Sequence, residues 1–259
     1  MTRPSHFLQD FTMNRTATVA ASSKASRTFL TAVGAACLVA IGLHFGMAHA
    51  AEPAVAIPAP AADEPAAGRH TETAVFAGGC FWGVQGVFQH VKGVTNAVSG
   101  YSGGKKETAQ YEVVGSGMTG HAESVQVTFD PAQVSYGKLL QVYFSVAHNP
   151  TELNYQGPDH GTQYRSALFP LDDGQRQVAT AYIAQLEAAK VFPKPIVTKV
   201  EAYKGFFAAE GYHQNYLTLN PDNPYIVYND LPKVTDLKKV FPGQYVDKPV
   251  LVPNVVASK

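Results

Sequence analysis

The apolar positions that follow residue 72 change their spacing at the first pair of glycines. Residues 73–77 form a short run that favours β-structure, and this run predicts a strand. Beyond Gly78 and Gly79 the apolar positions are spaced as on one face of a helix: Phe81, Val84, Val87, Phe88 and Val91. Cys80 therefore lies at the junction between a predicted strand and a predicted helix.

The rest of the chain alternates between strand-like and helix-like patterns and shows no internal repeat. Strands are predicted at residues 94–99, 124–129, 165–169 and 197–203, and helices at residues 135–146 and 172–191. Ser135 and Asp172 stand where the two helices would begin. From Asn220 onward Pro and Gly recur without a period, which predicts a segment that wraps over the surface. Interleaved strands and helices indicate one α+β domain of two layers.

Residues 1–50 have the order of a secretory signal peptide. An apolar stretch at residues 29–47 follows the basic residues Arg15, Lys24 and Arg27. Ala48-His49-Ala50 then offers a small-x-small cleavage site. We expect cleavage after Ala50 and export to the periplasm.

Other interpretations of this region stay open. The 19 mostly apolar residues are nearly enough for an uncleaved membrane anchor, and a lipoprotein signal would end at Cys37. Met13 is a plausible start of translation besides Met1. Residues 51–72 are rich in Ala and Pro without a helical or strand period, which predicts a linker.

The charge balance and the cysteine count narrow the function classes. Twenty Lys and Arg offset 20 Asp and Glu, so the formal net charge is zero and no basic stripe is available for phosphates. We expect no nucleic-acid partner. Of the two cysteines, Cys37 lies in the predicted signal, so the exported chain would keep Cys80 alone. The chain has no H-E-x-x-H and no paired cysteines, and the glycines around Cys80 match neither G-x-G-x-x-G nor a P-loop: Gly78, Gly79, Gly83 and Gly86. We expect no metal or nucleotide cofactor.

Cys80 has two interpretations. A free Cys is commonly a small buried hydrophobic residue with an inert, protonated thiol. Against this, the preceding glycines let the backbone expose the side chain, and the free N–H groups at the start of a helix favour a thiolate. Phe81 and Trp82, the only Trp of the chain, would place an apolar wall beside the sulfur.

Two polar motifs offer partners for this sulfur. Glu123 ends the motif Gly120-His121-Ala122-Glu123. It is either a solvated residue at a strand edge or, facing Cys80, a buried acid kept protonated by a raised pKa. The polar run at residues 158–165 is otherwise an ordinary loop. Three tyrosines in or beside these loops are either hydrogen-bond donors to a pocket or packing residues: Tyr101, Tyr111 and Tyr164.

Three motifs taken together resemble those of the A-type peptide methionine sulfoxide reductases. They are Gly79-Cys80-Phe81-Trp82-Gly83, Gly120-His121-Ala122-Glu123 and His160-Gly161-Thr162-Gln163-Tyr164-Arg165-Ser166. The resemblance runs over residues 73–242 and includes residues 212–217. It implies a catalytic domain at residues 73–242, with a ferredoxin-like α+β sandwich, additional loops and a C-terminal extension. Residues 243–259 would form a tail.

The resemblance also implies the chemistry. Cys80 would attack the sulfur of methionine sulfoxide while Glu123 protonates its oxygen. The implied substrate-binding residues are Phe81 and Trp82 around the methyl group, Tyr111 and Tyr164 at the oxygen, and Asp159 and His213. Such a site accepts one epimer, the S form, as free methionine sulfoxide or in oxidised proteins.

The chain departs from the family pattern in its last forty residues. Many family members carry further cysteines there, which attack the sulfenic acid left on the first one, but residues 220–259 contain none. The chain resembles the single-cysteine members instead. This resemblance implies no prosthetic cofactor and an external reductant: a thioredoxin-like protein, a glutaredoxin-like protein or a monothiol. We expect the protein to be a monomer.

Two other functions stay open from the residues alone. Cys80 followed by Trp82, with His213 further along, has the outline of a papain-like cysteine peptidase or acyltransferase. That pattern needs a second Cys four positions from the Trp, which the chain lacks, and Asn215 lies too near His213 to orient it in the usual way. The other alternative is an exported binding module with an inert Cys80. Turnover of a sulfoxide with dithiothreitol would separate these functions.

Overall fold

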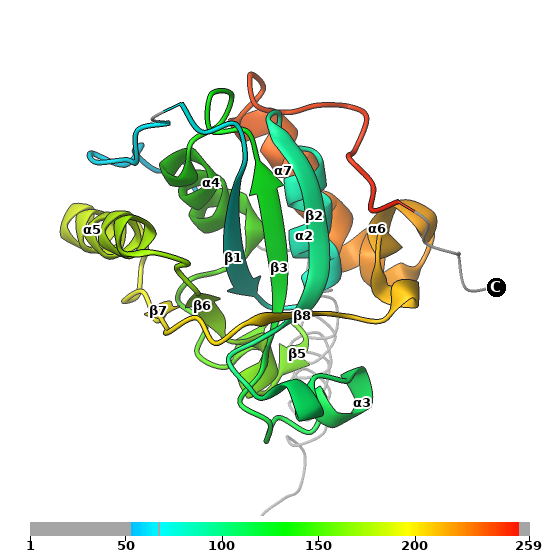
Figure 1. Cartoon of the computed structure of the whole chain (residues 1–259). Helices are drawn as coiled ribbons and strands as arrows, with labels where there is room; N and C mark the ends of the chain where they lie inside the picture. Colours follow the sequence, from blue (N-terminus) through cyan, green and yellow to red (C-terminus); the bar gives the residue numbers. More distant parts are fainter. Residues whose placement is uncertain (1–52, 67, 254–259) are drawn as a thin grey trace, which may run out of the picture. The chain divides into compact units, whose positions relative to one another are not determined.

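The computed structural model describes residues 53–66 and 68–253. The predicted signal peptide, its cleavage site and Cys37 lie outside the described residues, as does the end of the predicted tail. A mixed β-sheet with helices on one face forms the described domain (Figure 1). No helix in this part of the chain is long and apolar enough to cross a membrane.

The main sheet has six strands in the order β7-β6-β1-β3-β2-β8. β6 and β7 are parallel, and every other neighbouring pair is antiparallel. The strands are β1 (Glu72–Gly78), β2 (Val94–Ser102), β3 (Ala122–Phe129), β6 (Ser166–Leu168), β7 (Lys199–Val200) and β8 (Phe206–Ala208). A separate hairpin pairs β4 (Tyr155–Gln156) with β5 (Asp159–His160). The strand predicted at residues 197–203 is short because its partner β6 has three residues.

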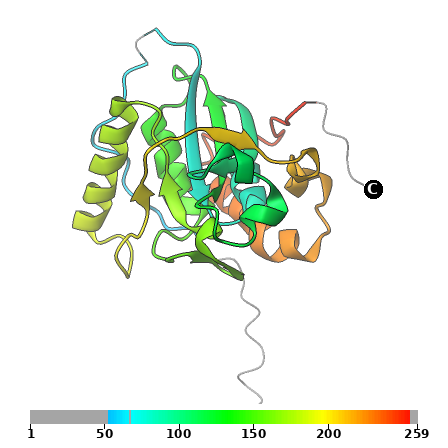
Figure 2. The same ribbon diagram turned by 60° about the horizontal axis from the view of Figure 1, so that its bottom comes forward.

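Helices cover the sheet on the face that lies behind it in Figure 1. The longer ones behind the sheet are α2 (Phe81–Gln89), α4 (Tyr136–Val142) and α7 (Leu231–Val240), while α5 (Asp173–Ala189) lies beside the sheet at its β7 edge. Short helical segments are η1 (Lys106–Thr108), α3 (Tyr111–Val114), η2 (Tyr143–Ala147), η3 (Thr162–Tyr164), η4 (Gly211–His213), α6 (Tyr216–Leu219) and η5 (Ile226–Asp230). The turned view in Figure 2 shows α3 and the nearby loops gathered at one end of the sheet.

The predicted helix caps are confirmed. The Ser135 side chain accepts a hydrogen bond from the backbone N–H of Lys138 at 3.2 Å, and the Asp172 side chain accepts one from Gln175 at 2.8 Å. The first helix, α2, is buried along almost its whole length because it lies between the sheet and α7. Its Phe88 ring stacks on Phe76 of β1 with ring centres 4.8 Å apart.

The segment after Asn220 is a correction to the sequence analysis, because it contains the helix α7. Leu231, Val234 and Leu237 recur at helical spacing, and the last two are buried. Pro232 stands in the first turn, where its missing N–H removes no helical hydrogen bond. A proline there resembles a helix breaker in sequence, although it marks a helix start.

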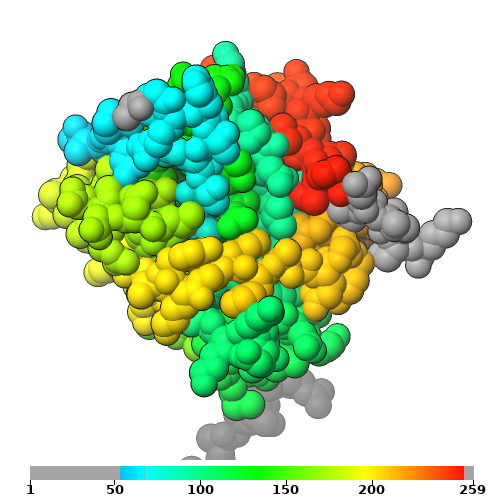
Figure 3. Space-filling model, viewed as in Figure 1, coloured from blue at the N-terminus to red at the C-terminus, as the bar shows by residue number. Residues whose placement is uncertain are grey.

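Residues 53–64, predicted as part of a linker, instead pack along the domain; we call them the N-terminal strap. Ile57 is buried, and Val55 bonds to the backbone of Ser145. The Asp63 carboxylate accepts hydrogen bonds from Ser135 Oγ and from the backbone N–H of Gly137. Figure 3 shows the blue and cyan strap lying against the yellow-green α5. The strap binds largely through backbone carbonyls, which no side-chain pattern in the sequence reveals.

Candidate active site

Cys80 lies where the central strand β1 passes into helix α2. Two glycines make the connection, and Gly79 has a φ of +84°, a conformation that residues with a side chain rarely adopt. A Cβ atom on Gly79 would come within 2.6 Å of the Gln156 Cβ. The turn therefore needs glycine both for its backbone and for the close approach of β4. Cys80 becomes the N-cap residue of α2, with 8% of its surface exposed.

The expected thiolate at this helix start is not the resting state. Burial raises the pKa of the Cys80 thiol well above its ordinary value, and the charges of Glu123, Asp230 and Asp159 raise it further. The backbone N–H of Trp82 lowers the pKa, but by less than these effects. The thiol is therefore protonated near neutral pH.

A hydrogen bond joins Glu123 to the residue that follows Cys80. Glu123 lies in β3, 3% exposed, and its Oε2 accepts a hydrogen bond from the backbone N–H of Phe81 at 3.0 Å. Burial raises its pKa to about 8, against the lowering effect of that hydrogen bond. Of the two interpretations of Glu123, the structure supports the buried acid.

Two of the three candidate tyrosines stand close to this carboxyl group. Tyr111 in α3 and Tyr164 in η3 are each partly buried. Burial and the nearby Glu123 raise the pKa of both hydroxyls, that of Tyr111 to about 12, so both are donors at neutral pH. Tyr101 has a different position: it is fully buried in β2, and its hydroxyl donates to Glu210 Oε2 at 2.9 Å.

Glu210, which the sequence analysis did not single out, holds this side of the site in place. Besides the Tyr101 hydroxyl, its carboxylate accepts a hydrogen bond from the backbone N–H of Tyr111 at 3.0 Å. One carboxylate thus joins β2, α3 and the segment before η4. Its only sequence signal is the neighbouring Gly211-Tyr212-His213 run.

Trp82 lies in an aromatic enclosure. Its ring stacks on Tyr216 with centres 3.8 Å apart and planes 9° apart, and meets the edge of Tyr225 at 5.9 Å. Its Nε1 donates to His213 Nδ1 at 3.2 Å. Phe81 is almost fully buried between His213 and Tyr101. Four further rings therefore pack on Phe81 or Trp82, namely Tyr101, His213, Tyr216 and Tyr225.

His213 supports Trp82 and is held neutral. It is 2% exposed, and burial lowers its pKa to about 4, against the effect of Glu210. Because Nδ1 accepts from the indole, the neutral ring carries its proton on Nε2. In a papain-like pair the imidazole would serve Cys80 instead, so the hydrogen bond to Trp82 argues against that alternative.

Asp159 and Asp230 add two carboxyl groups near the sulfur. Asp159 in β5 accepts a short hydrogen bond from the Tyr225 hydroxyl. Asp230 is fully buried beside the first turn of α2, where a Cβ atom on Gly83 would lie 2.1 Å from its Oδ1. Lys233 Nζ donates to that same Oδ1 at 3.2 Å. The sequence analysis identified Asp159 but missed Asp230, Lys233 and Tyr225, which come from the segment it expected to be irregular.

The remaining motif residues hold the loops together. The Arg165 guanidinium donates to the backbone carbonyls of Gly120, His121 and Thr162 and pairs with Glu201 at 2.7 Å. The Gly120–Glu123 and His160–Ser166 motifs are therefore tied to each other by one side chain, which explains why the two occur together.

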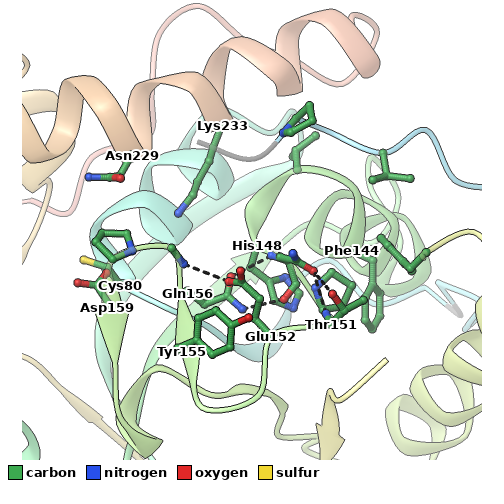
Figure 4. A pocket seen from close by; sticks show the side chains of 18 of the residues that line it. Cys80, Phe144, His148, Thr151, Glu152, Tyr155, Gln156, Asp159, Asn229 and Lys233 are labelled. Atoms are coloured by element: carbon green, nitrogen blue, oxygen red, sulfur yellow. Dashed lines mark hydrogen bonds between the residues drawn. The ribbon is translucent and has the colours of Figure 1, made fainter. Parts of the chain in front are cut away.

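A cavity of about 520 Å³ opens beside Cys80 (Figure 4). Asp159 lies next to Cys80 at one end, while Phe144 and Thr151 lie at the other end. Among the described residues, no group of three or more His, Cys, Asp or Glu side chains could hold a metal ion. The site therefore offers a thiol, a protonated acid, hydroxyl donors and an apolar wall.

Comparisons with known proteins agree with this site. Residues 72–244 match the sequence model of the family described as peptide methionine sulfoxide reductase. Peptide methionine sulfoxide reductase MsrA 2 of Mesorhizobium japonicum is 68% identical over 182 residues, which cover 70% of this chain and 93% of that protein. MsrA of Deinococcus radiodurans is 49% identical over 174 residues, 67% of this chain and 84% of that protein.

Solved structures give the same result. Reduced Mxr1 from Saccharomyces cerevisiae matches with a TM-score of 0.53 and 31% identity, over 62% of this chain and 91% of that one. Methionine sulfoxide reductase A of Corynebacterium diphtheriae matches with a TM-score of 0.50 and 32% identity, over 66% and 85% of the two chains. The chain belongs to the peptide methionine sulfoxide reductase family, and it is an enzyme that uses a thiol to reduce methionine sulfoxide.

Proposed function

We propose that Cys80 is the nucleophile and Glu123 the acid in the reduction of the S epimer of methionine sulfoxide, free or in proteins. The observation that carries this assignment is the hydrogen bond from the Phe81 backbone N–H to Glu123 Oε2, at 3.0 Å. It fixes a buried carboxyl group, with a pKa raised to about 8, one residue from the only cysteine among the described residues. A protonated acid and a thiol are the two groups that the reaction needs.

The first half of the reaction transfers oxygen from the substrate to Cys80. The sulfur of Cys80 attacks the sulfoxide sulfur. Glu123 gives its proton to the sulfoxide oxygen, which also accepts hydrogen bonds from the hydroxyls of Tyr111 and Tyr164. The protonated oxygen passes to Cys80 as a hydroxyl group, so methionine leaves and Cys80 becomes a sulfenic acid. The proton that the Cys80 thiol loses balances the one that Glu123 gives. The substrate sulfur gains two electrons, and the Cys80 sulfur loses them.

The shape of the site supports selection of one epimer. Trp82 is fixed on Tyr216 and His213, so the apolar wall cannot turn away. Glu123 and the two tyrosines define the oxygen position on another side. Three substituents of a chiral sulfur then have fixed places, and the S epimer is the one that the family resemblance implies. Equal consumption of both epimers from a racemic mixture would contradict this geometry.

The second half of the reaction requires an external thiol. One thiol attacks the sulfenic acid to give a mixed disulfide and water. A second thiol, from the same donor protein or from a second monothiol molecule, then releases Cys80 and leaves the donor oxidised as a disulfide. Because no second cysteine lies among the described residues, we propose a thioredoxin-like protein, a glutaredoxin-like protein or a monothiol as the donor. The protein would act without a prosthetic cofactor.

Replacing Cys80 by Ser tests the assignment. We expect Cys80→Ser to reduce the rate more than about a hundredfold, because a hydroxyl group near neutral pH is a far poorer nucleophile than a thiol. Far-UV circular dichroism would check that the variant folds. A variant that retained more than about one hundredth of the wild-type rate would overturn the role of Cys80, since acid catalysis alone supplies at most ~10²- to 10⁴-fold.

The stoichiometry without a reductant tests the recycling step. We expect one methionine per enzyme and a dimedone-reactive Cys80, after which turnover stops until a thiol is added. More than one methionine per enzyme without any reductant would require electrons that this mechanism does not contain.

We also propose that the protein is exported to the periplasm as a monomer, with residues 1–50 as its signal, and repairs oxidised exported proteins. The order of basic, apolar and small residues supports the signal. A membrane anchor is the second choice, and the intact mass of periplasmic protein separates a cleaved signal from an uncleaved anchor.

We also propose that the core of the domain is ferredoxin-like, as the resemblance implies. The β1-α2-β2-β3-α4-β6 order, with the strands arranged as β6-β1-β3-β2, supports it.

A further inference from the structure

The cavity beside Cys80 is lined by Cys80 and Asp159, but neither by Glu123 nor by the Phe81 and Trp82 rings. Its volume of about 520 Å³ lies in the range of sites for whole small ligands. An apolar wall in its lining is built by residues from three separate segments: Val55 of the strap, Phe144 and Val146 of η2, and Phe192 after α5. Phe144 lies at the end away from Cys80. None of these residues takes part in the sulfoxide chemistry.

The polar part of the cavity lies between Cys80 and this apolar wall. In Figure 4 Gln156, Tyr155 and Glu152 lie between the Cys80 end and the Phe144 end. The Gln156 side chain is fixed by two hydrogen bonds to the backbone of Asn149, at 2.9 and 2.7 Å, and it packs on Gly79. The floor of the cavity is thus attached to the turn that carries Cys80, which makes the two parts one continuous binding surface.

The strap holds its side of the wall firmly. The backbone N–H of Val55 donates to the Ser145 carbonyl at 3.0 Å, and Ser145 Oγ donates back to the Val55 carbonyl at 2.5 Å. The backbone N–H of Ala54 donates to Asp236 of α7. Val55 lies outside residues 72–244, which match the family. This wall is therefore completed by a part of the chain that the family pattern does not include.

We propose that this cavity is a subsite for an apolar side chain adjacent to the oxidised methionine in a polypeptide substrate. The cavity is continuous with Cys80, so a chain that delivers its sulfoxide sulfur there has neighbouring residues within reach of it. An apolar side chain would leave water for a wall of Val, Phe and Pro, which is favourable in proportion to the area buried. The proposal rests on Cys80 being the nucleophile.

A set of matched substrates tests the subsite in the full-length protein. The substrates are N-acetyl-methionine sulfoxide amide and three blocked peptides, in which methionine sulfoxide is flanked by glycines only, by Phe on its N-terminal side or by Phe on its C-terminal side. We expect one of the Phe peptides to have a kcat/KM about tenfold above that of the glycine peptide, as burial of part of an aromatic ring provides.

Variants on two different elements identify where the preference arises. Phe192→Ala should remove most of the preference for Phe while leaving kcat/KM for the acetyl amide within about twofold, because lost apolar contact affects only the flanking residue. Phe192→Leu should retain the preference. Val55→Trp, which fills the cavity from the strap, should remove it as well. Phe241→Ala is the matched control, because Phe241 is likewise a partly buried apolar residue but does not line the cavity.

Each outcome of this experiment decides the proposal. Loss of the Phe preference in Phe192→Ala and Val55→Trp, with normal turnover of the acetyl amide, supports it. A wild-type enzyme without a preference for Phe on either side overturns it, and so does an equal fall for all four substrates in the variants. A failure of the Cys80 assignment has a different signature, since the acetyl amide would then still be reduced by Cys80→Ser.

Discussion

At the scale of single residues, the proposed mechanism makes the pH at which the enzyme works depend on the proton of Glu123. The carboxyl group is protonated at neutral pH because burial raises its pKa to about 8. Cys80 needs the opposite change, since its thiol pKa is raised well above the ordinary value and the thiolate is the attacking form. A rise in pH therefore increases the fraction of Cys80 thiolate and decreases the fraction of protonated Glu123.

A pH profile of the first turnover tests this relation. We expect the second-order rate constant to rise with pH up to about 8, as the thiolate fraction grows, and to level off above it, as Glu123 loses its proton. In Glu123→Gln the rate should fall by ~10²- to 10⁴-fold, and the break near pH 8 should disappear. Glu107→Gln, on the exposed surface, is the control. If Glu123→Gln kept the break near pH 8, another group would be responsible for it.

At the scale of elements, the strap contributes to the stability of helix α4. Asp63 accepts hydrogen bonds from the N-cap residue Ser135 and from the Gly137 backbone N–H at 2.8 Å. These contacts satisfy polar groups at the start of the helix that would otherwise lack partners. The strap is thus a structural part of the domain.

Replacing Asp63 by Ala measures this contribution. We expect the free energy of unfolding to fall by about 1 kcal/mol, as for the loss of a helix cap. Asp222→Ala, at an exposed turn, should change it by less than about 0.5 kcal/mol. Urea unfolding of both variants gives the comparison, and equal stabilities would show that the strap does not stabilise α4.

Elements differ in how well the sequence predicts them, for physical reasons. Cys80 and Glu123 lie beside glycines and strand ends, so local patterns singled them out, while the family resemblance supplied their chemical roles. Strands β1 to β3 and helix α2 carry strong periodic patterns, and these predictions are confirmed within a few residues. The strap and α7 were missed because backbone hydrogen bonds and a proline in the first helical turn leave no such pattern.

The rest of the site could not be predicted from local patterns because it depends on tertiary contacts. Asp230 and Tyr225 reach the Cys80 region from a segment more than a hundred residues away in the chain. Their residue types are ordinary for a surface loop. Only the packing of α7 on α2 shows that they belong to the site.

At the scale of the whole molecule, Asp230 links stability to pH. Burial raises its pKa from 3.8 to about 6, although Lys233 lowers it. Between these two pH values the folded protein holds a proton that the unfolded chain has released, so stability falls as pH rises from about 4 to about 6 and stays lower above that. The ionised Asp230 is therefore a net cost to the fold at neutral pH.

Asp230→Asn removes this dependence and leaves an oxygen for Lys233. We compare the free energy of unfolding of Asp230→Asn with that of wild type at pH 4 and at pH 8. The difference should shift in favour of the variant by on the order of 2–3 kcal/mol between pH 4 and pH 8, since each pKa unit corresponds to about 1.4 kcal/mol. Urea unfolding at both pH values checks it, with Asp222→Asn as the exposed control. A constant difference between Asp230→Asn and wild type would show that Asp230 does not titrate in this range.

The packing of Trp82 gives the native protein an optical reporter. It is the only Trp of the chain, two positions after Cys80, with its ring stacked on Tyr216 and its indole N–H bound to His213. All indole fluorescence therefore comes from the active site. A change of Cys80 from thiol to sulfenic acid or mixed disulfide alters the electric field at this rigidly held ring. Oxidation by the substrate and reduction by the thiol can then be followed as separate emission changes in rapid mixing, without a label or a substitution.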